Sequence, residues 1–286
     1  MIGNYAMQNA FAYYKPKDGN TKLDLMSLNS VSGMYCLNYM FQNSYFTDIS
    51  IGIQSFNWPG SNSYMARQLC LSCSKLSNIV FPNLKTINAN YVFEHAFEAA
   101  NNLSTVEFPQ LSAMRSAHCF TNAFQNNSSI RYIRFPNLVS CSTDSTNVFY
   151  YMLAWTTTAS NRNIPIEIHF PKLTTIRGNG TSNIFSTVCP NTNANQRRPY
   201  KIFLNSIQTI TAGTTLGNGQ FYTCRGLTDI YFNSLTSIVN NYMLNNCNEL
   251  TGIHFGAANE ASIKATTGYS TLWGRGAGNA TVTFEL

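Results

Sequence analysis

The chain has 286 residues, of which only 10% are charged, and its formal net charge is +6. Its basic residues are scattered apart from Arg197, Arg198 and Lys201, so it lacks the concentrated basic stripe that nucleic-acid binding requires. No stretch approaches the roughly 20 consecutive apolar residues of a membrane span. Composition therefore argues against nucleic-acid binding and against membrane insertion.

The first 21 residues contain Phe11, Tyr13 and Tyr14 and end near a Lys-Pro-Lys-Asp-Gly turn. We expect residues 1–21 to form an N-terminal cap. This segment lacks the charged and apolar regions of a secretory signal. The chain is therefore a cytoplasmic product, a product whose leader has been removed, or a protein that leaves the cell by another route, such as inside a phage particle.

One phrase then recurs along the chain. LSNIVFPNL at 76–84 returns as LSTVEFPQL at 103–111 and as IRYIRFPNL at 130–138. Phe81, Phe108 and Phe135 are thus 27 residues apart by subtraction. The same frame continues, more loosely at the first two positions, at Leu25, Ile51, Phe170, Leu204, Phe232 and Phe255. A fixed period of this size predicts a solenoid of about nine stacked coils, with residues 22–257 as its body and the whole chain as one continuous domain.

Within each coil the alternation I-x-F predicts one short strand with its apolar side facing inward, and stacking these strands gives a parallel sheet. The three-residue spacing of Phe81, Leu84 and Ile87 predicts a bend that keeps apolar side chains inside. About six residues before the next strand, each coil carries an aromatic or large apolar plug, which we expect in the core. These plugs are Phe97, Phe124, Phe221 and Leu244.

Residues 258–286 leave this frame. Thr281 to Leu286 alternates like a final strand. Solenoids need an atypical terminal unit to cover the exposed core, so we expect 258–286 to form the C-terminal cap.

Three of the eight cysteines follow the repeat as well. A cysteine stands three residues before the first leucine of the repeated motif in three coils, at Cys73, Cys224 and Cys247. This shared position predicts small, buried, free thiols. Cys70 and Cys73 form one C-x-x-C without a second pair at zinc-ribbon spacing, so we predict no metal site.

These motifs resemble the BspA-like leucine-rich repeats, whose pattern is similar to LxxIxFPxLxxI followed by AFxxC or AFxxN. The matching elements are Ala96-Phe97, Ala123-Phe124, Cys224 and Cys247. The resemblance covers roughly residues 22 to 256. It implies a right-handed leucine-rich-repeat coil in a protein of the surface- or phage-associated type.

Side chains alternate across a strand, so the residues between the apolar ones point out of the concave face. In the coils from 132 to 231 this face combines aromatic and charged side chains, the usual composition of a recognition surface. The candidate ligand-binding residues are Tyr132, Arg134, Glu167, His169, Lys201, Phe203, Asp229 and Tyr231. The alternative is that they are ordinary strand residues chosen for β propensity.

Two insertions fall in the same half, because the intervals from Phe135 to Phe170 and on to Leu204 are 35 and 34 residues. The first includes Tyr150 to Met152 and Trp155, and the second includes Gly178 to Gly180 and residues 191–198. Loops on a rigid scaffold often carry function, so either could be a contact loop or surface filler. For Trp155 we favour packing.

Catalysis is not indicated, because the four histidines are spread over different coils and no catalytic motif is present. We predict a non-enzymatic binding module without cofactors or metal, for adhesion or host recognition. It would engage a protein or surface glycan through the concave face and the inserted loops.

The missing leader favours a phage virion component such as a tail fibre, acting outside the cell on a virion or cell surface, although a cytoplasmic location stays open. The alternative is a rigid structural or decoration protein that contacts neighbouring virion or surface proteins.

Overall fold

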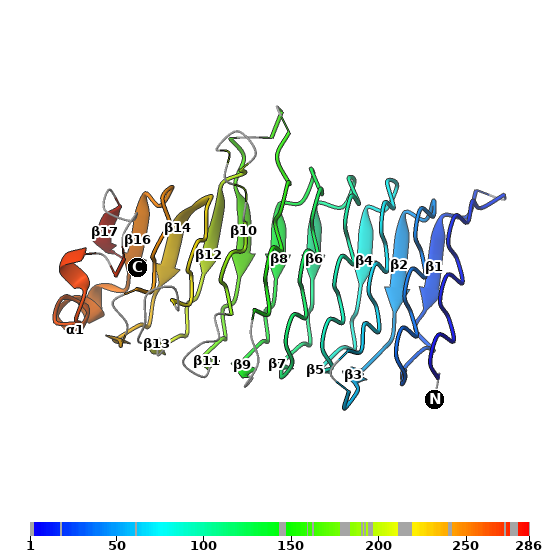
Figure 1. The fold of residues 1–286 in the computed structure, drawn as a ribbon, viewed down its shortest axis with the longest axis horizontal. Helices are drawn as coiled ribbons and strands as arrows, with labels where there is room; N and C mark the ends of the chain where they lie inside the picture. Colours follow the sequence, from blue (N-terminus) through cyan, green and yellow to red (C-terminus); the bar gives the residue numbers. More distant parts are fainter. Residues whose placement is uncertain are drawn as a thin grey trace.

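The structure is a computed structural model. It describes residues 3–17, 19–60, 62–142, 147–158, 160–161, 163–177, 184–189, 191, 193, 197–210, 219–239, 242–271, 273–274 and 280–285. The chain winds as a coil whose turns lie side by side along the long axis, from the N-terminus at one end to the C-terminal segment at the other (Figure 1).

Ten parallel strands form the main sheet, with neighbours in the order β1-β2-β4-β6-β8-β10-β12-β14-β16-β17. They are β1 (Lys22–Leu25), β2 (Asp48–Ile51), β4 (Asn78–Val80), β6 (Thr105–Glu107), β8 (Tyr132–Arg134), β10 (Ile166–His169), β12 (Tyr200–Phe203), β14 (Leu227–Phe232), β16 (Gly252–Phe255) and β17 (Thr281–Phe284). The predicted solenoid with a stacked parallel sheet is confirmed.

A second, narrower ladder runs along the lower edge in Figure 1, where the sequence predicted only a bend. Five strands pair in the order β11-β9-β7-β5-β3, and β13 pairs with β15. They are β3 (Ser55–Asn57), β5 (Thr86–Asn88), β7 (Ala113–Met114), β9 (Ser140–Ser142), β11 (Thr175–Arg177), β13 (Thr209–Ile210) and β15 (Ser237–Ile238). Strands such as β3 and β5 contribute Phe56 and Ile87 to the core but lack the I-x-F alternation that marks the main-sheet strands, which is why the sequence did not reveal them.

Stacked phenylalanines fill the core. The rings of Phe81, Phe108, Phe135 and Phe170 follow one another with centroid distances of 5.7, 5.3 and 5.0 Å. All four are fully buried, as are the predicted plugs Phe97, Phe124, Phe221 and Leu244. The 27-residue frame therefore places equivalent side chains directly on top of each other.

All eight cysteines are free and buried. The three that share a repeat position also donate to a main-chain carbonyl of the coil before. The Sγ of Cys73 lies 2.8 Å from the Phe41 oxygen, and that of Cys224 lies 2.8 Å from the Phe185 oxygen. Cys247 makes the same contact with Phe221 at 3.0 Å. The predicted small apolar packing is present, and the thiols add a hydrogen bond between coils.

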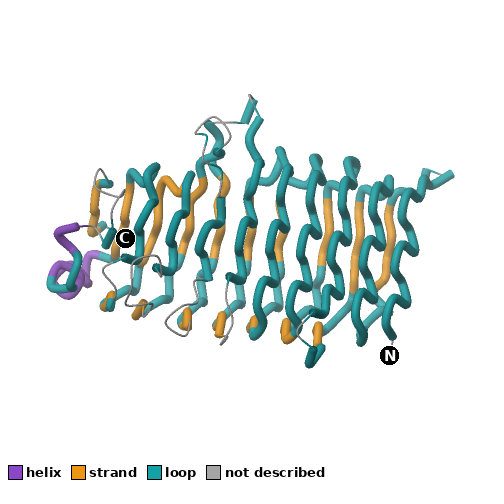
Figure 2. The backbone as a smooth tube through the Cα atoms, viewed as in Figure 1, coloured by secondary structure: helices purple, strands orange, loops and turns teal. Residues whose placement is uncertain are grey.

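Before β16, the described remainder of the coils consists of tight turns rather than helix (Figure 2). In the turn segments 4–13, 34–43, 65–72, 90–99, 117–126 and 148–155, φ is near +55° at about every fourth residue, for example Tyr35, Tyr39 and Asn43. Along such a segment, successive backbone N–H groups donate alternately to a carbonyl of the same coil and to a carbonyl of the next coil. The Phe41 N–H binds the Leu69 oxygen at 2.8 Å, whereas that of Gln42 binds the Tyr39 oxygen at 3.0 Å. These bonds offset the cost of left-handed backbone at non-glycine residues.

The first insertion does not lie where the sequence indicated. Tyr150 to Met152 lie within segment 148–155 and are not part of an inserted loop. Trp155 is 46% exposed, so the predicted packing is wrong. It occupies the outward, positive-φ position whose counterpart in the first coil, Tyr13, is also exposed. The chain rises above the stack further on, between β9 and β10 (Figure 1). Residues 178–180 lie outside the described residues, as do 192 and 194–196.

The two ends differ. Residues 4–13 form a turn segment like those of later coils. At the C-terminal end, the short helices η2 (Ala257–Asn259), α1 (Glu260–Lys264) and η3 (Tyr269–Thr271) precede β17. Trp273 is fully buried there, and its ring lies 5.8 Å from that of Phe255. Within the described residues, no helix has the length and apolar character needed to cross a bilayer.

Candidate binding face

The outward side chains of β8, β10, β12, β14 and β16 form the surface that we call the sheet face. The central isoleucines of these strands, such as Ile133, Ile168 and Ile202, are fully buried, so their neighbours point outward. Strand register arranges these neighbours in two rows. The first row is Tyr132, Glu167, Lys201, Asp229 and Gly252, and the second is Arg134, His169, Phe203, Tyr231 and His254. All eight predicted residues therefore lie together on one face.

The second row is a continuous ladder of stacked rings. The ring of Phe203 lies 4.3 Å from that of His169 and 4.4 Å from that of Tyr231, with interplanar angles of 1° and 8°. His254 extends the ladder at 4.3 Å from Tyr231. Parallel strands in register bring equivalent side chains this close, so the rings cover one another's faces.

Charges of both signs line the first row. Glu167 Oε2 lies 2.9 Å from His169 Nε2, and Lys201 Nζ lies 3.3 Å from Asp229 Oδ2. Burial acts against the charged form of Lys201, but Asp229 and Tyr231 outweigh this effect and raise the pKa of its ammonium group. These half-exposed pairs leave the face with little net charge, so it offers hydrogen bonds without a strong field.

The sequence-based prediction missed two residues of the sheet face that border Asp229, namely His254 and Gly252. His254 lies 3.3 Å from Asp229 Oδ1 through Nε2 and 2.9 Å from Thr283 Oγ1 through Nδ1. Gly252 makes room for the first contact, because a Cβ there would lie 2.4 Å from His254 Nε2 and 2.6 Å from Asp229 Oδ1. The repeat frame already placed Gly252 and His254 on this face, and no other feature of the sequence indicated their contact with Asp229.

Tyr132 and Arg134 flank the ladder at its N-terminal side. Tyr132 is the most exposed of the eight at 37%, and the Arg134 guanidinium lies 4.7 Å from its ring centroid. The ladder rings are shielded on their faces, so they present edges, a tyrosine hydroxyl and imidazole nitrogens. Face-on stacking of a sugar is therefore confined to the ends of the ladder, whereas a flat partner can contact its whole length.

A second ring ladder, which we call the tyrosine ladder, lies on the turn segments. It consists of Tyr5, Tyr35, Tyr64, Tyr91 and His118, with successive centroid distances of 5.3, 5.3, 4.9 and 4.8 Å. The sequence-based prediction missed it, because the rings sit at positive-φ positions.

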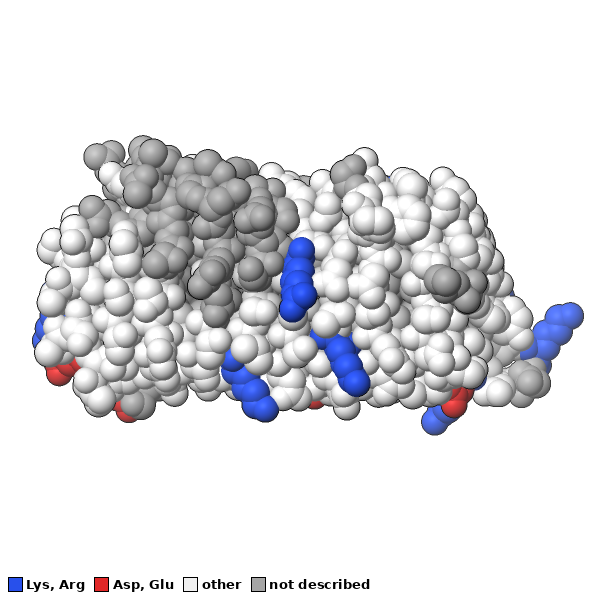
Figure 3. All heavy atoms as spheres, turned by 90° about the horizontal axis from the view of Figure 1, so that it is seen from below, with Lys and Arg blue, Asp and Glu red and all other residues white. Residues whose placement is uncertain are grey.

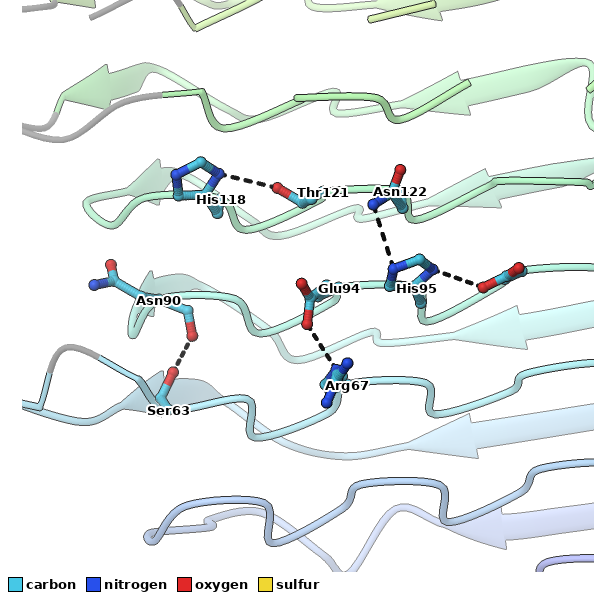
Figure 4. Close-up of polar contacts among 9 residues, drawn as sticks. Ser63, Arg67, Asn90, Glu94, His95, His118, Thr121 and Asn122 are labelled. Carbon is cyan, nitrogen blue, oxygen red and sulfur yellow. Dashed lines mark hydrogen bonds and ion pairs between the residues drawn. The ribbon is translucent and has the colours of Figure 1, made fainter. Parts of the chain in front are cut away.

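Figure 4 shows polar contacts between neighbouring coils in the part of the chain that carries the tyrosine ladder. Arg67 pairs with Glu94 at 2.7 Å, and the His95 ring lies between the Glu98 carboxylate at 2.6 Å and the Asn122 amide at 3.3 Å. Most of these side chains are therefore held to one another across neighbouring coils.

Charge is sparse elsewhere. In Figure 3 the Lys and Arg side chains stand apart from one another on a surface of mostly uncharged residues. Within the described ranges, no three His, Cys, Asp or Glu side chains converge on a point where they could hold a metal ion.

The family model for the BspA type leucine rich repeat region matches residues 20–124 and 166–267 in six copies. The chain belongs to the BspA-type leucine-rich repeat family. Repeats of this family are generally of the protein-binding or adhesion type and typically surface-associated. The unmatched stretch, 125–165, contains most of the first long interval.

Among solved structures, the chain is similar to a leucine-rich repeat protein from Bacteroides ovatus ATCC 8483, with 17% identity and a TM-score of 0.36. The match covers 100% of this chain and 64% of the other. No curated protein matches the chain.

Proposed function

We propose that this BspA-type repeat protein is a non-catalytic binding module whose sheet face engages a protein partner in adhesion or host recognition. The observation that carries the proposal is the pair of rows, in which four stacked rings lie beside four interleaved charged side chains. Aromatic and arginine side chains on a rigid support are typical of binding hot spots.

The geometry favours a protein over a glycan as the partner. Ring edges along the ladder suit a flat apolar or backbone surface, and the mixed charges of Glu167, Lys201 and Asp229 suit polar groups at an interface rim. A sugar chain would find exposed ring faces only at the ladder ends. We place the protein at an outer surface of a cell or virion; neither the structure nor the family match indicates a phage tail.

The test replaces Tyr132, Phe203 and Tyr231 together by Ala and measures attachment of the purified protein to candidate cells. We expect attachment to fall at least tenfold while the circular dichroism spectrum is unchanged. The matched control replaces Tyr35, Tyr64 and Tyr91, three rings of the tyrosine ladder, and should keep attachment. Undiminished attachment of the sheet-face variant, or an equal loss in the control, would reject the assigned face.

Treating the cells before the assay identifies the class of partner. If the partner is a protein, trypsin treatment of the cells removes attachment and periodate oxidation of glycans does not. The opposite pattern would show that a glycan binds and would contradict the protein assignment.

A second candidate function, a structural unit in a larger assembly, is favoured by strand β1. Among the described residues β1 pairs only with β2. The Leu25 carbonyl accepts from the Gly52 N–H on the β2 side, so the backbone groups of Lys22 and Asp24 point to the outer edge, where the Lys22 N–H donates to Asn20 Oδ1 at 3.2 Å. In an antiparallel pairing with a second copy, Lys22 would lie opposite Asp24 of that copy, and Asp24 would lie opposite its Lys22. Two opposite-charge pairs would result.

Sedimentation at increasing concentration tests this assembly. Lys22→Asp should shift the protein to monomer, and the double variant with Asp24→Lys should restore the dimer. The structural candidate fails if the protein is monomeric at every concentration, or if the charge reversal has no effect.

A further inference from the structure

Two arginines flank the start of strand β10. Arg131 lies one residue before β8, and Arg198 lies two residues before β12. Because β10 runs between β8 and β12 in the main sheet, the two residues stand on either side of it. Arg198 is only 1% exposed, which is unusual for a charged side chain that has no carboxylate partner in the described ranges.

The Arg198 side chain reaches back across the coil that contains β10. Its Nε donates to the Ile164 oxygen at 2.8 Å, and its Nη1 donates to the Ser128 oxygen at 3.3 Å. Asn161 donates to the same Ser128 oxygen at 2.6 Å, which holds the segment 156–161 against this point. Ser128 is three residues before Arg131, so the guanidinium of Arg198 is fixed beside the chain that carries Arg131.

Among the described residues, neither arginine has a compensating carboxylate. Nη2 of Arg198 and Nη1 of Arg131 are buried and have no hydrogen-bond partner in the described part of the chain. No carboxylate of that part lies within 4.0 Å of either side chain. Burial, and then the charge of Arg131, lower the pKa of Arg198 to about 10, so it is still a cation at pH 7. A buried guanidinium beside a half-buried one, each with an unused donor, is costly without a counter-charge.

We propose that Arg131 and Arg198 bind one small oxyanion, a phosphate, sulfate or carboxylate group, at the start of β10. Guanidinium groups are planar forks of donors that match such oxygens. The hydroxyl of Thr157 is also buried, has no hydrogen-bond partner among the residues that the structure describes, and belongs to the segment held against Ser128, so we count it as a further donor. The two carbonyl contacts of Arg198 satisfy the donors on Nε and Nη1 but leave Nη2 without an acceptor. Water could satisfy the third but would not neutralise the charges.

This site does not depend on the sheet face. Isothermal titration with sodium phosphate, sodium sulfate and sodium acetate, against sodium chloride of equal ionic strength, measures it directly. We expect saturable binding of one anion per chain, weakened at least tenfold in Arg131→Met. Arg115→Met, which removes an exposed arginine, should bind as the original protein does.

The anion that binds identifies the chemistry. Acetate binding assigns a carboxylate site, and binding of phosphate or sulfate alone assigns a tetrahedral oxyanion. No saturable binding of any of them, or equal binding in Arg131→Met, overturns the proposal.

A second variant tests the site even if the loss of an arginine impairs folding. Arg131→Glu places a carboxylate beside Arg198 and replaces the ligand from within the chain. Its thermal midpoint in chloride should exceed that of the original protein and should no longer rise when phosphate is added. A lower midpoint in chloride, or an undiminished response to phosphate, contradicts the site.

Discussion

Replacing Phe135 by Ala removes the ring at the centre of the stack. Phe135 is fully buried. It lies between the parallel rings of Phe108 at 5.3 Å and Phe170 at 5.0 Å. Phe120 and Phe149 approach it at steep angles at 5.5 and 5.8 Å. The substitution therefore opens a cavity against four other rings.

The expected loss is about 3–5 kcal/mol in the free energy of unfolding, the usual cost of Phe→Ala in a core. The four ring pairs, at roughly 0.5–1.5 kcal/mol each, place this site toward the upper end. A solenoid is stabilised by neighbouring repeats only, so a defect in a central coil also uncouples the coils on its two sides. We therefore expect a less cooperative transition as well as a lower midpoint.

Urea unfolding followed by far-ultraviolet circular dichroism measures both effects. The control is Val139→Ala, which also shortens an apolar side chain but at a position that is 45% exposed. It should stay within about 0.5 kcal/mol of the original protein. A loss below about 1 kcal/mol for Phe135→Ala, with one sharp transition, would refute the stacked core.

Three further outcomes follow from individual residues. Asn127→Ala should cost about 1–3 kcal/mol in urea unfolding, because the buried Oδ1 accepts two backbone N–H groups at 3.0 and 2.9 Å; a loss under about 0.5 kcal/mol would argue against those bonds. Burial raises the pKa of Cys119 and Cys189 to about 12, so these thiols keep protons that the unfolded chain releases above pH 9. Stability should therefore fall between pH 9 and 12, by about 1.4 kcal/mol per pH unit for each thiol, and a flat profile would disprove their burial. Gly252→Ala should turn the His254 ring away from Asp229, visible as lost proximity in NMR spectra, and an unchanged ring position would contradict the crowding there.

The core and the sheet face could be predicted because each follows from a period. The 27-residue interval of Phe81, Phe108 and Phe135 fixes the stacking, and the alternation around Ile133 or Ile202 fixes which side chains point outward. Those two periods are properties of the sequence itself. Their combination was enough to bring eight residues, spread over about 100 positions, to one surface.

The turn segments could not be predicted in the same way. Left-handed backbone is usually marked by glycine, but here Tyr91, His95 and Trp155 adopt it. These conformations are stabilised by hydrogen bonds to the next coil, which have no local sequence signal. For that reason the tyrosine ladder was missed and Trp155 was wrongly expected to be packed.

The contact between His254 and Asp229 was missed for a different reason. It depends on the absence of a side chain at Gly252, which becomes visible only once the strand register is known. The unused donors of Arg131 and Arg198 likewise appear only when residues 67 positions apart in the sequence are placed side by side.

A crystal structure of the protein tests the central claim most directly, namely that coil stacking assembles one binding face. It should show His169, Phe203, Tyr231 and His254 in a single row, with neighbouring ring centroids 4.3, 4.4 and 4.3 Å apart. Rings that lie on different faces, or strands β8 to β16 that are not neighbours in one sheet, would contradict it.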